Sequence, residues 1–90
     1  MPETPLESAV QARLIGRLHE LGYFVCKLNL VSIGGFPDLF AAKDGVVTLI
    51  ECKRPGGKPR PLQLACHRQL LNHGVRVIVY DGTTDITDMI

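Results

Sequence analysis

Hydrophobic residues recur at helical spacing near the N-terminus, at Leu6, Val10, Leu14, Leu18 and Leu21. The segment that starts this pattern is typical of a helix N-terminus, with Thr4 as the cap, Pro5 at the first helical position and Glu7 at the third. Gly22 supplies a favourable C-terminal stop. The pattern therefore predicts a helix over residues 5–21.

Shorter stretches rich in branched and aromatic residues predict strands at 23–28, 38–43, 46–53 and 75–80. Asp44-Gly45 is a good two-residue hairpin turn, so we expect the second and third strands to be antiparallel. A second helix is predicted to begin at Pro61, to run to His73 and to end at Gly74. The last strand is nearly all apolar, and we expect it to be covered on both faces.

This order of elements predicts an α/β fold with an αβββαβ core, in which helices flank one mixed four-stranded sheet. With 90 residues and no internal repeat or linker, the sequence predicts one domain over residues 1–90. A domain of this size is near the lower limit of what folds alone, so self-association would be a natural supplement. Apolar residues make up 46% and charged residues 21%, as in an ordinary soluble globular protein. No apolar run approaches the roughly 20 residues that cross a bilayer, and the N-terminus lacks the features of a signal peptide, so no membrane association is expected.

Cysteines and histidines give no sign of a structural zinc site. The three cysteines, Cys26, Cys52 and Cys66, are odd in number and form no Cys-x-x-Cys pair. This argues against a disulfide framework and favours a reducing cytosol. The three histidines, His19, His67 and His73, also lack zinc-motif spacing and are interpreted as ordinary surface or core residues.

The net charge of +1 conceals a strongly basic segment. Between Cys52 and Tyr80 there is no acid, and the basic residues are Lys53, Arg54, Lys58, Arg60, Arg68 and Arg76. Such clustering suits a polyanionic partner, nucleic acid first, although a solvated basic face would give the same pattern.

The predicted hairpin brings two acids together, because Asp38 and Glu51 each stand at the sixth position from the turn pair. Glu51 and Lys53 project to the same face, since side chains alternate along a strand. Taken singly, Glu51 and Lys53 could be a solvent-exposed strand end, and Asp38 a turn residue after proline. Together, two facing carboxylates would repel each other unless a cation lies between them. Hard oxygen ligands of this kind predict Mg²⁺ or Mn²⁺.

Two further polar residues lie on the apolar sides of the predicted helices. Glu7 is only 20° from both Leu14 and Leu18, so it is expected either to cap its own helix or to face a cation. Gln63 is 20° from Leu70 and could instead satisfy a backbone amide at the start of the second helix.

The residues Glu7, Gly35-x-Pro37-Asp38, Glu51-x-Lys53 and Gln63 resemble the VRR-NUC family of the PD-(D/E)xK nuclease superfamily. The αβββαβ order also matches that superfamily's core, so the resemblance covers nearly the whole chain. It implies a metal-dependent phosphodiesterase acting on DNA, similar to the stand-alone bacterial and phage members. These resemble Holliday-junction resolvases, structure-selective endonucleases that act as homodimers on branched DNA. The resemblance also implies a location in the cytoplasm of a bacterium or phage-infected host cell, and it leaves a helicase or other replication or repair protein as a further partner.

The resemblance also implies a role for each motif residue. Asp38 and Glu51 would bind Mg²⁺ or Mn²⁺, helped by the main-chain carbonyl of Cys52, and Glu7 would complete the shell directly or through water. Lys53 would orient the attacking water and offset charge on the phosphate.

The remaining candidates would act on the substrate. Gln63 is implied to steady Lys53 or the scissile phosphate. DNA contacts are expected from the basic loop after Lys53, through Arg54, Lys58 and Arg60, with Lys27, Asn29 and Ser32 as weaker candidates. The chain contains no recognisable base-reading module, so the expected recognition is of DNA shape and backbone.

Two rival functions stay open. The same fold could be a non-catalytic binding module for DNA or protein, although paired acids repel DNA unless a cation intervenes. It could also be a less selective endonuclease that cuts duplexes or flaps, although so short a chain holds no separate specificity domain.

Overall fold

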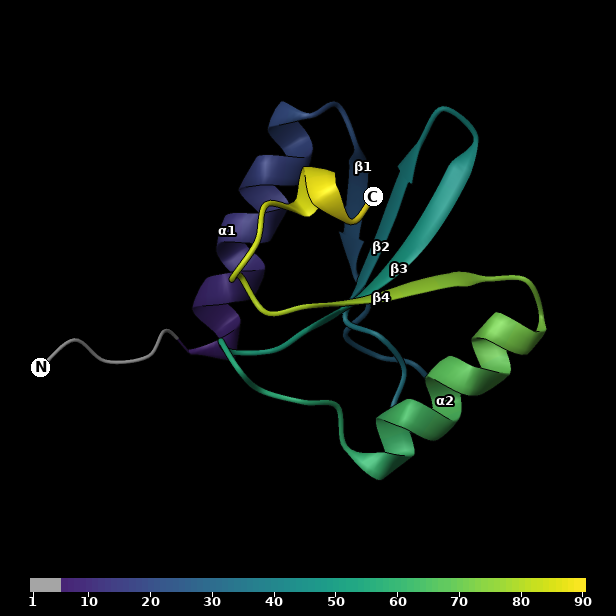
Figure 1. Ribbon diagram of the computed structural model, residues 1–90. Coiled ribbons are helices and arrows are strands. Elements are labelled where there is room, and N and C mark those ends of the chain that lie inside the picture. The colour runs from purple at the N-terminus through teal and green to yellow at the C-terminus, as the bar shows by residue number, and fades with distance from the viewer. Residues whose placement is uncertain (1–5) are drawn as a thin grey trace, which may run out of the picture.

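The sheet has four strands in the order β1-β2-β3-β4, and a helix precedes the first strand and the last. The computed structural model describes residues 6–90 (Figure 1). The elements are α1 (Glu7–Glu20), β1 (Phe24–Lys27), β2 (Leu39–Lys43), β3 (Val46–Cys52), α2 (Pro61–Asn72), β4 (Arg76–Tyr80) and the short 3-10 helix η1 (Ile86–Asp88). Strands β1, β2 and β3 are antiparallel neighbours, and β4 runs parallel to β3. The predicted α/β fold with a mixed sheet in αβββαβ order is confirmed.

Helix α1 begins later than its sequence pattern predicts. Its first helical residue is Glu7, after Leu6 in an extended conformation, so Glu7 stands at the first helical position and not at the third. The predicted cap, Thr4, and Pro5 lie outside the described residues. The apolar side of the helix buries its residues at the predicted spacing: Val10, Leu14 and Leu18.

The β2–β3 hairpin has the predicted tight turn. Asp44 and Gly45 both have positive φ angles, 52° and 80°, as a two-residue turn with a matching twist requires. The register pairs Lys43 with Val46 at the turn and Leu39 with Ile50 at the open end. The residues directly beyond that open end are therefore Asp38 and Glu51.

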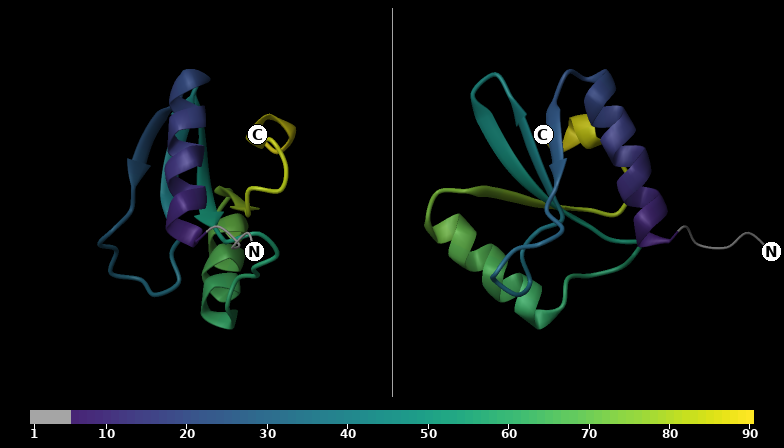
Figure 2. Two further views of the ribbon diagram at one scale, coloured as in Figure 1. Left: turned by 90° about the vertical axis from the view of Figure 1, so that its left-hand side faces the viewer. Right: turned by 180° about the vertical axis from the view of Figure 1, so that it is seen from behind.

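The two helices pack against opposite faces of the sheet. One face carries the apolar core, in which α1 and η1 pack against β2 and β3: Leu14, Leu18, Leu39, Ala41, Ile50, Cys52 and Ile86. The left view of Figure 2 looks onto α1 with the strands behind it. Glu51 alternates with Ile50 and Cys52, so its side chain projects from the other face, where it contacts α2. Glu51 is thus buried under α2, whereas Asp38 at the same end of the hairpin is half-buried.

Strand β4 differs from its prediction in the degree of its burial. Both faces of β4 are contacted as expected, since Ile78 and Tyr80 pack against the core and α2 lies against the other face, but Arg76 is exposed and the four residues after it are only half-buried. The burial is incomplete because β4 is an edge strand with a neighbouring strand on one side only. None of the described helices is long and apolar enough to cross a membrane.

Candidate active site

Asp38 and Glu51 face each other at the open end of the hairpin, as the spacing from the turn predicts. The main-chain amide of Asp38 donates to the carbonyl of Ile50 at 3.0 Å, which continues the strand pairing by one residue. The Asp38 carboxylate accepts a hydrogen bond at Oδ2 from the main-chain amide of Cys52, at 2.8 Å. A side chain that bonds to the backbone of the opposite strand has little freedom, so Asp38 is held beside Glu51.

Glu51 is completely buried, with 0% of its surface exposed. The plainer interpretation of Glu51 as a solvent-exposed strand end is therefore wrong, because α2 lies over this part of the sheet. Burial first, and the nearby Asp38 carboxyl group second, raise the pKa of Glu51 to about 8, against the opposing effect of Lys53. At neutral pH this buried carboxyl group would therefore ionise fully only if a cation offset its charge.

Lys53 is the cation that the chain itself supplies. Its side chain is 8% exposed, so the strand-end interpretation is wrong for this residue as well. Its Nζ lies 3.9 Å from Oε2 of Glu51 and 4.0 Å from Oε2 of Glu7. The backbone of Lys53 is fixed by a hydrogen bond from its amide to the carbonyl of Tyr80 at the end of β4. The ammonium group therefore stands between a strand-borne acid and a helix-borne acid.

Glu7 brings a third carboxylate from the start of α1. Its side chain is 48% exposed, yet one of its oxygens lies with oxygens of Asp38 and Glu51 in a group whose members are all within 4.8 Å of one another. Two oxygens bound to one divalent ion at about 2.1–2.4 Å can be at most about 5 Å apart. The three carboxylates, contributed by α1, the β2 entrance and β3, thus fit a hard divalent cation in both spacing and chemistry.

Gln63 satisfies a backbone amide at the start of α2, which is one of the two roles that its sequence position suggests, and it also contacts the buried acid. Its Oε1 accepts a hydrogen bond from the amide of Arg60 at 2.8 Å, which caps the first turn of α2. Its Nε2 donates to Oε2 of Glu51 at 3.3 Å. Gln63 therefore couples the start of α2 to the buried acid, and its described contact is with Glu51 rather than with Lys53.

His67 is the site residue that the sequence analysis missed. It is buried, with 5% exposed, and its Nε2 lies 3.2 Å from Oε1 of Glu51. Burial lowers the pKa of His67, and the charge of Lys53 lowers it further. The available signal was its spacing, because a residue four positions after Gln63 lies only 40° away around the helix.

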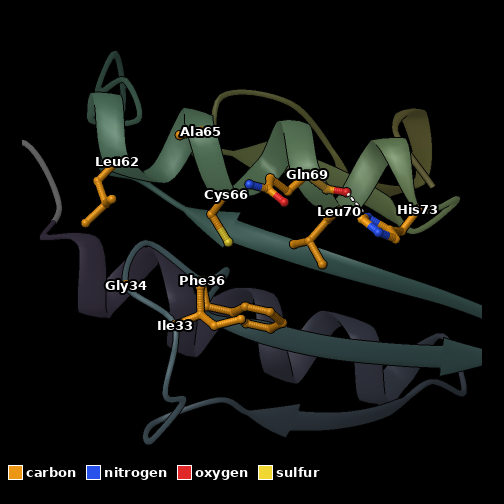
Figure 3. Close-up of a pocket in the computed structure, with 9 residues that line it drawn as sticks. All are labelled: Ile33, Gly34, Phe36, Leu62, Ala65, Cys66, Gln69, Leu70 and His73. Carbon is orange, nitrogen blue, oxygen red and sulfur yellow. Dashed lines mark hydrogen bonds between the residues drawn. The ribbon is translucent and has the colours of Figure 1, made fainter.

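The loop before Asp38 packs directly against α2. Gly35 has a φ of +78°, and a Cβ at this position would lie 2.6 Å from the carbonyl oxygen of Leu62. The same loop and α2 line an apolar groove of about 440 Å³ (Figure 3). Within it, Cys66 and Leu70 point from α2 toward the loop. The glycine is therefore needed for close approach, which fixes the distance between Asp38 and the start of α2.

The candidate DNA-contact residues are all exposed: Lys27, Asn29, Ser32, Arg54, Lys58 and Arg60. They lie on two connections that both lead into the acidic cluster. One is the segment from the end of β1 to Asp38, and the other joins β3 to α2. A polyanion bound across these connections would pass over the acidic cluster.

No family model matches the chain. The chain is 36% identical over 77 residues to "Putative nuclease p44" of Acyrthosiphon pisum secondary endosymbiont phage 1, and the match covers 84% of this chain and 83% of the relative. A solved structure described as "VRR_NUC domain" superposes with a TM-score of 0.80 at 30% identity, covering 92% of this chain and 91% of the other. Sequence, fold and acidic cluster agree, and the chain belongs to the VRR-NUC family of nuclease domains.

Proposed function

We propose that the chain is a Mg²⁺- or Mn²⁺-dependent endodeoxyribonuclease that hydrolyses phosphodiester bonds in branched DNA, four-way junctions first, and that it acts as a homodimer. The observation that carries the proposal is the convergence of three carboxylates beside a buried lysine. Acids this close to a basic DNA-facing segment would weaken binding of DNA unless a cation lies between the two negative partners.

Asp38, Glu51 and Glu7 would hold the cation, together with the main-chain carbonyl of Cys52. When bound, such a cation lowers the pKa of a coordinated water and stabilises the charge of an in-line phosphoryl transition state. Lys53 would orient the attacking water and offset charge on the phosphate. The contacts of Gln63 support a role through Glu51, whose carboxylate it holds by a hydrogen bond.

Arg54, Lys58 and Arg60 would bind backbone phosphates next to the scissile bond, and Lys27, Asn29 and Ser32 would extend that contact. Contacts of this kind position DNA without reading its sequence. A two-fold dimer would present two active sites to symmetric strands, which is the geometry that cutting a four-way junction requires.

The test is a substrate panel of four-way junction, flap, splayed arm and linear duplex, each incubated with Mn²⁺ and with excess chelator. We expect metal-dependent cleavage with the junction cut fastest, and at least a hundredfold loss of rate in Glu51→Gln and Lys53→Met, on the order seen when groups that stabilise a transition state are removed. Asp88→Ala, which changes an exposed acid of η1 far along the chain, is the matched control and should cleave normally.

The other outcomes separate the rival functions. Equal cutting of all four substrates would reject selectivity for branched DNA and leave a general duplex or flap endonuclease. Binding of DNA without cleavage under any metal would favour the non-catalytic binding module. Full cleavage in excess chelator would refute the metal mechanism.

A further inference from the structure

The basic connection between β3 and α2 begins with a tight turn. The Gly57 amide donates to the Arg54 carbonyl at 2.8 Å, which closes a four-residue turn over residues 54–57. Pro55 and Gly56 occupy its central positions, and Gly56 has a φ of +78°, as the third residue of a type II turn requires. The turn's own hydrogen bond does not use the amide of this third residue, so the Gly56 N–H is free to bind a partner from elsewhere.

Asp81, directly after β4, is that partner. Its Oδ2 accepts from the Gly56 amide at 3.2 Å, and its Oδ1 accepts from the amide and the hydroxyl of Thr83, at 3.0 Å and 2.6 Å. The hydrogen bonds from Thr83 first, and the one from the Gly56 amide after them, hold the pKa of Asp81 below its ordinary value. One ionised carboxylate therefore joins the turn after β4 to the turn after β3.

Two hydrogen bonds connect the segments that follow β3 and β4. The first runs from the Lys53 amide to the Tyr80 carbonyl, so the backbone of Lys53 is held without any help from Asp81. The second is the bond from Gly56 to Asp81. Among the hydrogen bonds of the described residues, it is the one that ties residues 54–59 to the rest of the fold. The orientation of the turn therefore depends on Asp81.

We propose that Asp81 is a positioning residue for DNA binding, which fixes the turn at residues 54–57 and so sets the direction in which Arg54 and Lys58 meet backbone phosphates. This inference rests on the proposed function, in which these two exposed residues contact DNA. A turn that is already held in one conformation loses less conformational entropy when a phosphate binds, so its contacts contribute more to affinity. The negative charge of Asp81 acts in the opposite direction, because an acid near the DNA weakens binding.

Asp85 offers a matched comparison from the same part of the chain. Its Oδ1 accepts from the amide and the hydroxyl of Thr87, at 3.0 Å and 2.9 Å, as Oδ1 of Asp81 does with Thr83. Its Oδ2 instead accepts from Nη2 of Arg17 on α1, at 3.4 Å. The two acids thus make the same kind of turn and differ in what the second oxygen binds.

The experiment compares Asp81→Ser with Asp85→Ser. Each change removes one negative charge, and a serine hydroxyl can still accept from the amide two residues on, so both turns are retained. Serine has a single, shorter-reaching oxygen, so at position 81 it cannot hold the Gly56 amide at the same time. Fluorescence anisotropy with a labelled four-way junction in excess chelator gives Kd over a series of salt concentrations. Cleavage with Mn²⁺ gives KM and kcat, and thermal unfolding checks that both variants are folded.

We expect Asp81→Ser to bind the junction severalfold more weakly than the wild type, although it has lost an acid. The slope of log K against log salt should fall in magnitude by about 1 to 2, for the one or two phosphate contacts that the loosened turn no longer makes. KM should rise while kcat stays close to that of the wild type, because the Lys53 backbone and the three carboxylates keep their contacts. Asp85→Ser should bind the junction at least as tightly as the wild type does.

The inference is overturned if Asp81→Ser binds the junction as tightly as the wild type or more tightly, since the acid would then act through its charge alone. It is also overturned if both serine variants weaken binding equally, or if Asp81→Ser weakens binding with an unchanged salt slope. In these three results the wild type still binds DNA, so the proposed function stands. A wild-type protein that does not bind DNA would refute the proposed function and the inference together.

Discussion

Glu51 carries a carboxyl group that the fold removes from water and places beside a second acid. Its burial, more than any single neighbour, raises its pKa to about 8. Because unpaired buried charge is costly, the metal-free protein favours the protonated form, and a bound cation would favour the ionised form. The protonation of this one side chain therefore links the stability of the fold to the occupancy of the site.

The first prediction concerns the metal-free protein, whose free energy of unfolding should fall as the pH rises toward and through about 8. The pKa of Glu51 is raised from 4.5 to about 8 in the folded state, so the folded protein keeps a proton that the unfolded chain has lost. The contribution of this bound proton to stability is complete below pH 4.5 and disappears as the pH rises past about 8. Between about pH 6 and about pH 9 the loss should be on the order of 2 kcal/mol, measured by urea unfolding in a chelator.

Glu51→Gln provides the control for this prediction, because an amide of nearly the same shape does not titrate. Its stability should stay nearly constant over the same pH range. An equal loss of stability in the wild type and in the glutamine variant would assign the pH dependence to another group.

The sequence predicts the position of Asp38 and Glu51 because both depend on local information, the length of a hairpin and its turn type. The burial of Glu51 depends on α2, which approaches from another part of the chain, so strand alternation alone left the exposed alternative open. His67 was missed for the same reason, since its partner is 16 positions away. Spacing places it beside Gln63 on the helix, but only the packed fold shows which residue the two share.

At the scale of the elements, the first turn of α2 holds the site together. Gln63 caps this turn and also hydrogen-bonds to Glu51, while the loop before Asp38 lies against the Leu62 carbonyl at Gly35. The acid on the loop, the acid on β3 and the helix start are thus joined through neighbouring residues. A displacement of the start of α2 would therefore change the positions of both acids.

We predict that Gly35→Ala will damage both stability and cleavage. The new Cβ would lie 2.6 Å from the Leu62 carbonyl oxygen, so loop and helix must separate. Gly74→Ala is the matched control, because this glycine also has a positive φ, +80°, but a Cβ added there would meet no heavy atom within 4 Å beyond its chain neighbours in the described residues. The control should cost only the conformational penalty, about 1–2 kcal/mol.

Gly35→Ala should exceed that cost by about 1–3 kcal/mol, as for other steric insertions into packed structure, and should reduce cleavage at least tenfold under conditions where both variants are folded. Thermal unfolding and rate measurements check the two parts separately. Equal stability and equal rates in the two variants would show that the loop–helix contact is unimportant.

The basic connection between β3 and α2 permits a prediction about affinity. Lys58 and Arg60 are exposed, and each phosphate contact that they make should contribute about 0.9 to the slope of log K against log salt. Changing both to glutamine should therefore reduce the slope by about 2 in DNA-binding titrations done without divalent metal. Arg76→Gln, at the opposite end of β4 from Tyr80, is the control, and an unaltered slope in the double variant would exclude this loop from the contact.

The bounds of the helices and of most strands could be predicted from the sequence, whereas the burial of β4 and the presence of η1 could not. Strands and helices were predicted within a few residues because periodicity and turn residues are local properties. The half-burial of β4 was not predicted, since an apolar strand gives no sign of whether another strand lies beside it. The short helix η1 was not predicted either, because its start depends on Asp85, whose side chain accepts from the Thr87 amide in a tail with weak periodicity.

Over the whole molecule, apolar surface remains exposed on the face of the sheet that α2 covers only in part. Phe24 is 68% exposed and Val47 is 40% exposed, and Phe24 stacks edge-to-face on Phe40 with ring centroids 6.3 Å apart. Phe24 and Val47 share the face of Leu49 and Glu51. Exposed apolar surface on a small domain is consistent with the proposed homodimer, in which a second copy would cover this face.

We predict that Phe24→Lys will convert the proposed dimer to a monomer without unfolding it, because the side chain is exposed in the single chain. Light scattering after size-exclusion chromatography would measure the mass directly. Ala12→Lys, on an exposed position of α1 at the opposite face, should leave the mass unchanged. A wild-type monomer at all concentrations, or a dimer that survives Phe24→Lys, would reject this face as the interface.

The hydrogen bond from the Cys52 amide to Oδ2 of Asp38 has a practical consequence for trapping an intact DNA complex. Truncating Asp38 to alanine would remove an acceptor that the backbone of β3 uses, so the inactive protein would differ from the native one in its backbone contacts as well as in charge. Asparagine retains an oxygen that can accept this hydrogen bond, and it lacks the negative charge. Asp38→Asn is therefore the preferable inactive variant for co-crystallisation with an uncut junction.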